Sequence, residues 1–280
     1  MLITTKKDSN LLEYLLENTD YTKSKIKSLF KYKNILVNGK VPFRLDDTVK
    51  KGSSIEISKE KREVSIGKIP IVYEDSDYLV VNKPSGMLTI STDKEKNRTL
   101  YHMVRGYVNS KKNHEKIFIV HRLDRETSGL VLFCKNEVLR DKIQENWEKV
   151  AVLREYRAVV SGILPKKKAK LVNYLKENKN NTVYVANDGK KAITNYEVIK
   201  EDDNSLLKIV IETGRKNQIR VQLANIGYPI IGDKKYSDSK DKKMYLLASR
   251  LDIKDPRTNK LLSFEVNVPR DYLKKLTISK

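Results

Sequence analysis

The sequence predicts an α+β protein in which a small α/β module precedes a larger domain built on a mixed, largely antiparallel β-sheet. Two observations support this prediction. From residue 69 onward, strand-like apolar runs are frequent and helical patterns are few. The first 58 residues differ, because two short amphipathic helices come before two strands. We therefore divide the chain into a module at 1–58, a charged linker at 59–68 and a larger domain at 69–280.

The module is predicted to begin with two helices. Leucines form an apolar stripe over Leu11–Leu16, and a second helix is expected over Thr22–Tyr32. Strands are expected at Ile35–Val37 and Ile55–Ile57. In the second helix, lysines recur at every fourth residue and so share one face: Lys23, Lys27 and Lys31. Such a stripe is usually only a solvated surface, and binding of phosphate groups is the alternative.

The charge balance points to polyanionic partners. Lysine and arginine number 57 against 36 aspartates and glutamates, and the net charge is +21. An excess of this size attracts nucleic acid from a distance, although a lysine-rich solvated surface is the plainer interpretation. We expect no membrane partner, because no segment approaches the roughly 20 apolar residues of a membrane span and none resembles a signal peptide. The single cysteine, Cys134, excludes an internal disulfide, and we expect a reducing, cytoplasmic location.

Metal and nucleotide-cofactor chemistry are not expected. The chain has three histidines without the spacing of metal ligands, namely His102, His114 and His121. No two glycines form a Gly-x-Gly pair, and the phosphate-binding Gly-x-x-x-x-Gly-Lys motif is absent from the sequence. Any reaction must therefore be carried out by side chains, with no cofactor.

The larger domain is expected to open with strands at Ile69–Val72 and Tyr78–Val81, followed by a turn at Lys83–Gly86. A helix is predicted over Asn136–Val150. Trp147 lies on the apolar face of that helix, which favours a place in the core over a role as a stacking platform.

Further along, Arg154–Val160 alternates as a strand does, and Tyr156 falls on its apolar face. Core packing alone would explain this tyrosine. Lysine-rich stretches at 166–170 and 176–181 are predicted to be loops or hairpin tips. A helix is expected to start after Gly214, and its first residues are cationic, which suits a phosphate: Arg215 and Lys216.

One charged segment stands between two apolar runs. Asp124 lies between Arg122 and Arg125, after the run Ile117–Val120 and before the run Leu130–Phe133. Because both runs have the pattern of buried strands, the carboxylate is expected in a loop held by a rigid sheet. From chemistry alone it could be a structural ion-pair partner or a reactive group.

This segment, His-Arg-Leu-Asp followed by Thr-Ser-Gly-Leu, resembles the signature of the RluA-type pseudouridine synthase family. The Lys-Pro-Ser-Gly turn resembles the family's first shared motif. The resemblance implies that Asp124 is the catalytic residue and that Arg220 is the basic partner that keeps it ionised. The resemblance also implies that Tyr156 is the aromatic wall against a flipped base. Tyr156 lies in an Arg-x-Tyr-x-Ala stretch, in which Arg154 stands where the family usually has lysine.

The chain departs from the family pattern at four positions where histidine is usual. The residues found there are Asn217, Gln222, Tyr228 and Leu247. These departures put RNA contacts and target choice in doubt, but they leave the aspartate, the tyrosine and the arginine in place.

The N-terminal module resembles the small RNA-binding module of ribosomal small-subunit protein S-four. This resemblance implies a platform that grips structured RNA through its phosphates. The residues expected to contact RNA come from both parts of the chain: Lys23, Lys27, Lys31, Arg122, Arg125, Arg215, Lys216 and Gln218.

The resemblance therefore implies an RNA pseudouridine synthase that flips a uridine out of its stack. Its expected substrate is structured RNA, with large-subunit ribosomal RNA foremost and transfer RNA as a further candidate. The aspartate could attack ribose C1′ or abstract a ribose proton, and the sequence does not choose between them. The alternative is a non-catalytic RNA-binding or ribosome-assembly factor on the same fold. The family also implies a monomer.

Overall fold

The computed structural model describes residues 1–31, 34–39, 42, 44–58, 65–93, 95–110 and 116–277, with the side chain of Lys31 excepted. The chain separates into two compact units, Met1–Val64 and Ser65–Lys280. Each unit is described by itself.

The described residues of the first unit form two helices and two small sheets. Its elements are β1 (Leu2–Thr4), β2 (Ser9–Asn10), α1 (Leu11–Asn18), α2 (Lys23–Lys31), β3 (Ile35–Val37), β4 (Thr48–Val49) and β5 (Ser54–Ile57). One sheet has the order β1-β5-β3, and β2 pairs with β4. The Asn10 side chain caps α1 by accepting from the backbone N–H groups of Leu12 and Glu13. The two predicted helices and two predicted strands are confirmed.

Apolar side chains of α1, α2, β3 and β5 pack together as the core of this unit, among them Leu15, Ile26 and Ile55. On α2, Lys23 and Lys27 are exposed. The side chain of the third lysine in the predicted stripe, Lys31, lies outside the described residues. Most of the predicted linker, 59–64, also lies outside them. Its last part does not form a linker, because Ser65–Ile66 is strand β6 and pairs with β7.

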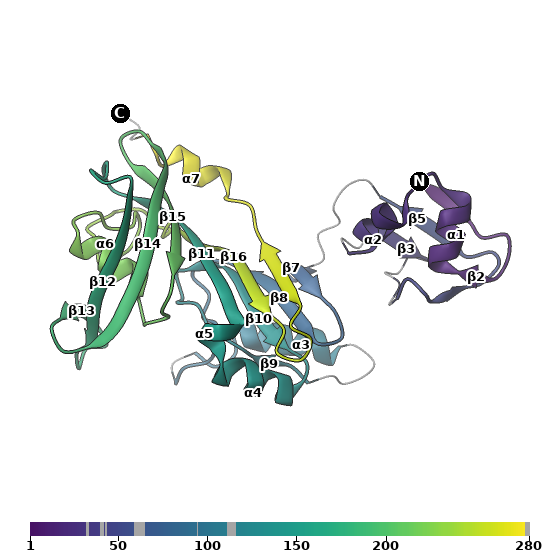
Figure 1. Ribbon diagram of the computed structural model, residues 1–280, viewed down its shortest axis with the longest axis horizontal. Coiled ribbons are helices and arrows are strands. Elements are labelled where there is room, and N and C mark those ends of the chain that lie inside the picture. Colours follow the sequence, from purple (N-terminus) through teal and green to yellow (C-terminus); the bar gives the residue numbers. More distant parts are fainter. Residues whose placement is uncertain are drawn as a thin grey trace. The chain divides into compact units, whose positions relative to one another are not determined.

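In its described residues, the second unit is built on one sheet of twelve strands. Figure 1 shows the arrangement of most of these strands. The strands are β6 (Ser65–Ile66), β7 (Ile69–Glu74), β8 (Tyr78–Lys83), β9 (Phe118–Ile119), β10 (Ser128–Cys134), β11 (Ala151–Val160), β12 (Lys168–Glu177), β13 (Val183–Ala186), β14 (Lys190–Glu201), β15 (Ser205–Ile211), β16 (Leu246–Lys254) and β17 (Leu261–Glu265). The helices are α3 (Leu100–Asn109), α4 (Glu137–Glu145), α5 (Trp147–Val150), α6 (Gln218–Asn225) and α7 (Arg270–Lys274). The order is β13-β12-β14-β15-β11-β16-β10-β8-β7-β6, with β9 beside β10 and β17 beside β16.

Among the described strands of this sheet, pairing is antiparallel except between β10 and β16, which run parallel. The predicted mixed, largely antiparallel sheet is therefore confirmed. The stretch predicted as a loop or hairpin tip at 166–170 lies mostly in the long strand β12, which pairs with β13 and β14 (Figure 1). That prediction was wrong because the lysines occupy an exposed strand face, where charge does not prevent pairing. The second predicted stretch, 176–181, ends β12 and forms the hairpin turn before β13, as expected of a hairpin tip.

The centre of the sheet is buried on both faces. Along β8, Tyr78 and Val80 join one apolar cluster, which also contains Leu139 and Ile143 of α4. Leu79 and Val81 join the cluster that contains residues of α3. This double burial explains the nearly continuous apolar runs in the central strands, since neither face can be polar.

The parallel junction of β10 and β16 depends on Gly129. A Cβ atom at this position would lie 2.3 Å from the backbone oxygen of Ala248, and the residue has a φ of +116°. Only glycine permits this close approach. The glycine of the Thr-Ser-Gly-Leu motif therefore allows β10 to run directly beside β16, with Asp124 in the loop just before it.

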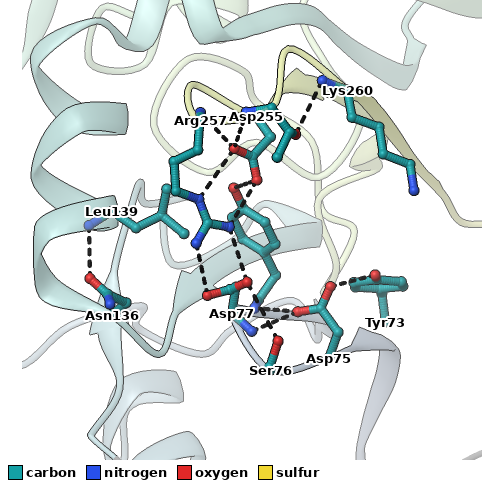
Figure 2. A network of polar contacts seen from close by, with 11 residues as sticks. Tyr73, Asp75, Ser76, Asp77, Asn136, Leu139, Asp255, Arg257 and Lys260 are labelled. Carbon is teal, nitrogen blue, oxygen red and sulfur yellow. Dashed lines mark hydrogen bonds and ion pairs between the residues drawn. The ribbon is translucent and has the colours of Figure 1, made fainter. Parts of the chain in front are cut away.

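An ion network joins the start of β8 to the turn that follows β16 (Figure 2). Arg257, in the turn between β16 and β17, donates to both carboxylate oxygens of Asp77 at 3.1 and 3.0 Å, and to Asp255 at 3.1 Å. The Tyr78 hydroxyl donates to Asp255 at 2.8 Å. Burial alone would raise the pKa of Asp255, but the hydrogen bonds from Arg257 and Tyr78 lower it to about 2. The network ties the start of β8 to the β16–β17 turn.

None of the helices in the described part of the chain has the length and apolar character needed to cross a membrane.

Candidate active site

Asp124 lies in a loop that other segments hold in place. Thr89 fixes the residue before it, because its hydroxyl donates to the Leu123 carbonyl at 2.6 Å and accepts from the Leu123 N–H at 3.2 Å. The Ser85 hydroxyl donates to the Glu126 carbonyl at 2.7 Å. The carboxylate of Asp124 therefore sits on a rigid support, and its side chain is 34% exposed.

Lys83 explains why the Lys-Pro-Ser-Gly turn accompanies this loop. Its fully buried side chain donates to the backbone carbonyls of Pro84 at 3.1 Å, Met87 at 2.8 Å and Arg125 at 3.0 Å. Burial lowers the pKa of Lys83 to about 8. Lys83 thus joins the turn to the loop that carries Asp124. Its side chain does not line the cavity that contains the Asp124 carboxylate.

Arg220 meets Asp124 across the site. Its Nη1 lies 3.3 Å from Asp124 Oδ2. Its stronger partner is Asp233, whose two oxygens accept from Nε and Nη2 at 2.7 Å each, and whose side chain is 1% exposed. Burial lowers the pKa of Arg220, but the hydrogen bonds to Asp233 outweigh this and the net shift is upward. Asp233, which follows Gly232 in a short Gly-Asp pair, was not singled out from the sequence.

Tyr156 lies on β11 and is half-buried, and its side chain lines the same cavity as Asp124. Burial raises the pKa of Tyr156 to about 12, so the phenol is neutral at physiological pH. A neutral aromatic ring beside a carboxylate can pack against a planar group without adding charge.

The cavity at Asp124 has a volume of about 110 Å³. It brings together residues that lie far apart in the sequence, and its lining includes Arg122, Asp124, Tyr156, Ile211, Arg215 and Arg220. The three residues expected to act in chemistry therefore line one cavity. A carboxylate, a buried cation and a neutral aromatic ring form a set suited to nucleophilic or acid–base chemistry.

The predicted RNA contacts of the second unit have different surroundings. Arg122 is exposed at the cavity. Arg125 pairs with Glu95 at 2.8 Å, and Lys216 pairs with Glu177. Arg215 Nε donates to the Lys191 carbonyl at 3.0 Å. These residues remain near the surface, with part of their hydrogen-bonding capacity already used.

Gln218, the remaining predicted RNA contact of this unit, is engaged in internal hydrogen bonds. Its side chain is buried, with Oε1 accepting from Thr213 at 2.8 Å and from the Arg215 N–H at 3.0 Å. Its Nε2 donates to Ile193 and Thr194. These hydrogen bonds show that Gln218 positions the loop formed by Thr213, Gly214 and Arg215, and the residue also lines the cavity at Asp124. It also begins α6, so Arg215 and Lys216 lie in the turn before the helix.

The four residues at the usual histidine positions all have internal contacts. Asn217 adopts a left-handed conformation (φ 53°), accepts from Arg220 at 3.3 Å and donates to the Tyr236 hydroxyl at 3.0 Å. Gln222 is fully buried and donates to Asn173 at 2.9 Å. Tyr228 and Leu247 pack in apolar clusters. None of the four departures disturbs the contact between Asp124 and Arg220.

The predicted helix at 136–150 breaks at Asn146, where the backbone has φ −119° and ψ 28°, and α5 follows. Leu139, Ile143 and Val150 are buried as predicted. Trp147 packs only partly against the core, and it stacks on His121 with ring centroids 4.9 Å apart. The tryptophan therefore lies at the wall of a second cavity, which the helical periodicity alone did not reveal.

The fold and the site define an enzyme that works through side chains of a mixed-sheet domain. The chain belongs to the RNA pseudouridylate synthase family, whose family model matches residues 77–225. It is similar to ribosomal large subunit pseudouridine synthase D of Haemophilus ducreyi, with 31% identity over 84% of this chain and 77% of that one. The same enzyme of Buchnera aphidicola subsp. Acyrthosiphon pisum is 29% identical, and the match covers 90% of this chain and 88% of the relative.

Solved structures agree on the fold. Human RNA pseudouridylate synthase domain containing 4 superimposes with a TM-score of 0.62 at 20% identity, covering 74% of this chain and 91% of that one. Human RNA pseudouridylate synthase domain containing 1 superimposes with a TM-score of 0.61 at 22% identity, covering 77% of this chain and 89% of that one. These two structures confirm the α+β fold.

Proposed function

We propose that this enzyme isomerises uridine to pseudouridine in large-subunit ribosomal RNA, with Asp124 as the catalytic carboxylate. The observation that carries the proposal is the 3.3 Å contact between Asp124 and Arg220 in a cavity walled by Tyr156. The names of the relatives support the substrate, since several are ribosomal large subunit pseudouridine synthases. Transfer RNA is the second candidate. The net charge of +21 suits either one.

The reaction needs no cofactor. The bond between ribose C1′ and N1 of uracil breaks, the base turns, and a bond forms between C1′ and C5. The proton at C5 is lost, N1 gains a proton, and no electrons are exchanged with another molecule. A carboxylate at the ribose can attack C1′ or abstract a ribose proton, and either route stabilises the sugar while the base is detached.

The surrounding residues have distinct tasks in this proposal. Arg220 pairs with the Asp124 carboxylate and holds it aimed at the ribose. Tyr156 stacks on the flipped uracil, which adds about 1–3 kcal/mol per stacked base. Arg122, Arg125, Arg215 and Lys216 contact phosphates around the site. This arrangement offsets the few kcal/mol that flipping costs.

The first unit supplies further RNA affinity. Lys23 and Lys27 lie exposed on α2, at the spacing that places them on one helix face. We propose that this face grips RNA phosphates, together with Lys31. A cytoplasmic location follows from a ribosomal substrate, and we retain the expectation of a monomer.

Replacement of Asp124 by asparagine tests the function. Pseudouridine is mapped chemically in ribosomal and transfer RNA from cells that lack the gene and carry either the wild-type chain or Asp124→Asn. We expect one or more ribosomal sites to disappear on deletion, to return with the wild type and to stay absent with the variant. The purified variant should bind RNA with near-normal affinity, since its shape is preserved.

The matched control is Asp271→Asn, at a carboxylate that pairs with Lys243 away from the cavity, and it should restore every site. If deletion removes no site and the purified protein modifies no RNA, the function is refuted. If Asp124→Asn still turns over, the role of the aspartate is refuted and the function stands.

A further inference from the structure

A second cavity, of about 250 Å³, adjoins the one at Asp124. The two share four lining residues: Arg122, Tyr156, Ile211 and Gly214. The second cavity does not include Asp124 in its lining, so it is not the place where the chemistry occurs. A water molecule occupies about 30 Å³ in the liquid, and the cavity is therefore large enough for a nucleobase.

One wall of this cavity is aromatic. His121 and Trp147 stack on each other with ring planes 23° apart, and both line the cavity. Nε2 of His121 accepts from the Leu132 N–H at 3.2 Å, so the proton of the neutral ring is on Nδ1. Burial, together with the charge of Arg154, lowers the pKa of His121 to about 4, which keeps the ring neutral. His121 therefore offers a donor.

Arg154 brings a second donor, and that donor is unused. Its side chain is buried, and Nη2 donates to the Glu212 carbonyl at 2.6 Å. Among the described residues, however, Nε has no hydrogen-bond partner. A buried N–H without a partner costs about 1–3 kcal/mol, and such groups in native proteins are usually satisfied by a ligand or water. The family usually has lysine here, which lacks this Nε–H.

One acidic side chain and one further cation of the wall, Glu155 and Arg250, are already engaged. The carboxylate of Glu155 pairs with Arg157 at 2.5 Å and with Lys208 at 3.5 Å. Arg250 donates to both oxygens of Asp252, at 3.0 and 2.9 Å. The lining of the cavity thus combines an aromatic wall with two donor-bearing side chains, His121 and Arg154, and it favours a planar ligand that carries acceptors.

We propose that the second cavity receives the base of the nucleotide next to the target uridine, and that Arg154 and His121 select guanine there. Guanine presents two neighbouring acceptors, O6 and N7, on one edge, which is the pattern that arginine recognises best. Adenine replaces one of them with a donor. Because the two cavities share a wall, the neighbour of a uridine bound at Asp124 can reach this site. This inference rests on the proposed function.

Trp147 is the single tryptophan of the chain, so its fluorescence reports on this cavity directly. The Asp124→Asn protein is titrated with GMP, AMP, CMP, UMP and inorganic phosphate at up to millimolar concentration. We expect saturable quenching with GMP, at an affinity several-fold higher than with AMP, and no saturable change with phosphate. Equal affinity for all four nucleotides, no saturable change, or saturation by phosphate alone overturns the proposal.

Two substitutions locate the ligand. Arg154→Met should weaken GMP binding by about tenfold or more, because a hydrogen bond from a charged donor is lost. Lys168→Met removes the same charge from an exposed strand position and should leave binding unchanged. Should Arg154→Met fail to fold, Arg154→Lys keeps the charge without the Nε–H and should lose the preference for GMP over AMP. Preserved preference in the lysine variant also overturns the proposal.

The binding measurement needs no turnover, so its outcome is independent of the proposed function. Binding of GMP that depends on Arg154, in a protein that restores no pseudouridine in cells, would refute the function and leave the cavity assignment intact. Where a modified site is mapped, we expect guanosine beside it.

Discussion

Asp233 holds Arg220 through two parallel hydrogen bonds of 2.7 Å, and this leaves Nη1 of the arginine to face Asp124. The ring of Tyr236 lies beneath the same guanidinium, 5.2 Å from its carbon to the ring centroid. The arginine is thus held by a pair of groups that do not themselves contact the aspartate. Asp233 and Tyr236 therefore set the orientation of the Arg220 guanidinium toward Asp124.

Replacement of Asp233 by asparagine should lower the rate of the chemical step by about a hundredfold, because a shift of about 1 Å in a positioning group costs that much. KM for RNA should change little, since Asp233 is buried and does not face the substrate. Single-turnover kinetics with a mapped RNA fragment measure both values. Breaking one partner of a buried pair also costs about 3–5 kcal/mol of stability, which thermal unfolding records.

Asp271→Asn serves as the control, because that carboxylate is 43% exposed and pairs with a lysine away from the cavity. A variant of Asp233 that folds and turns over at the wild-type rate would contradict the positioning role.

Protonation of His121 should destabilise the fold at acid pH. Its pKa in the folded protein is about 4, against about 6.5 in an unfolded chain, because burial disfavours the charged ring. Its contribution is fully present above pH 6.5 and is lost as pH falls toward 4, at a cost of up to about 3 kcal/mol. The free energy of unfolding, measured against pH without RNA, should fall less steeply in His121→Asn.

His102 provides the comparison, because it is exposed on α3. His102→Asn should retain the wild-type slope between pH 6.5 and 4. Identical slopes for His121→Asn and the wild type would rule out His121 as the source.

Replacement of Lys23 and Lys27 by methionine should weaken RNA binding and reduce its dependence on salt. Each phosphate contact contributes about one unit to the slope of log K against log salt concentration, so the double variant should lose about two units. Filter binding over a range of salt concentrations gives this slope.

Lys25 is an exposed lysine of the same helix, two residues from each of the others and therefore on the opposite side. Lys25→Met should leave the slope nearly unchanged. Equal effects from the two sides would indicate diffuse attraction without a binding face.

Arg257→Met should destabilise the second unit by about 2 kcal/mol, because Asp255 would keep its charge in a buried position without its main donor. The folded pKa of Asp255, about 2, lies below its usual value of 3.8. The stabilisation is therefore present above about pH 4 and fades as pH falls toward 2. The difference between variant and wild type in urea unfolding should shrink over the same window.

The exposed pair of Arg44 and Asp46 is the reference, and Arg44→Met should change stability by less than about 0.5 kcal/mol. A difference for Arg257→Met that is constant down to pH 2 would contradict the assigned origin.

Local patterns predicted much of the fold. The strands around Tyr78 and Leu130 are apolar runs buried on both faces, and short buried runs of this kind can be recognised along the sequence. Strand β12 escaped prediction because its exposed lysines resemble those of a loop, and its pairing with β14 is decided by residues far away in the sequence. The break at Asn146 was hidden because the apolar period continues across it.

The site was predicted unevenly for a similar reason. Asp124 stands in a long and unusual motif, so the family resemblance pointed to it. Asp233 is one carboxylate in a short Gly-Asp pair, and its importance depends on a guanidinium 13 residues earlier. The burial of Gln218 was not foreseen because nothing in the sequence tells a buried amide from an exposed one.

The parallel junction at Gly129 has a consequence for synthesis of the chain. β10, which follows Asp124, is joined there to β16, whose residues are translated more than a hundred positions later. Until β16 emerges from the ribosome, β10 and β11 have no strand between them, and the aspartate and the tyrosine are not held around one cavity. A nascent or truncated chain ending before residue 246 therefore carries every expected chemical group and still lacks a site.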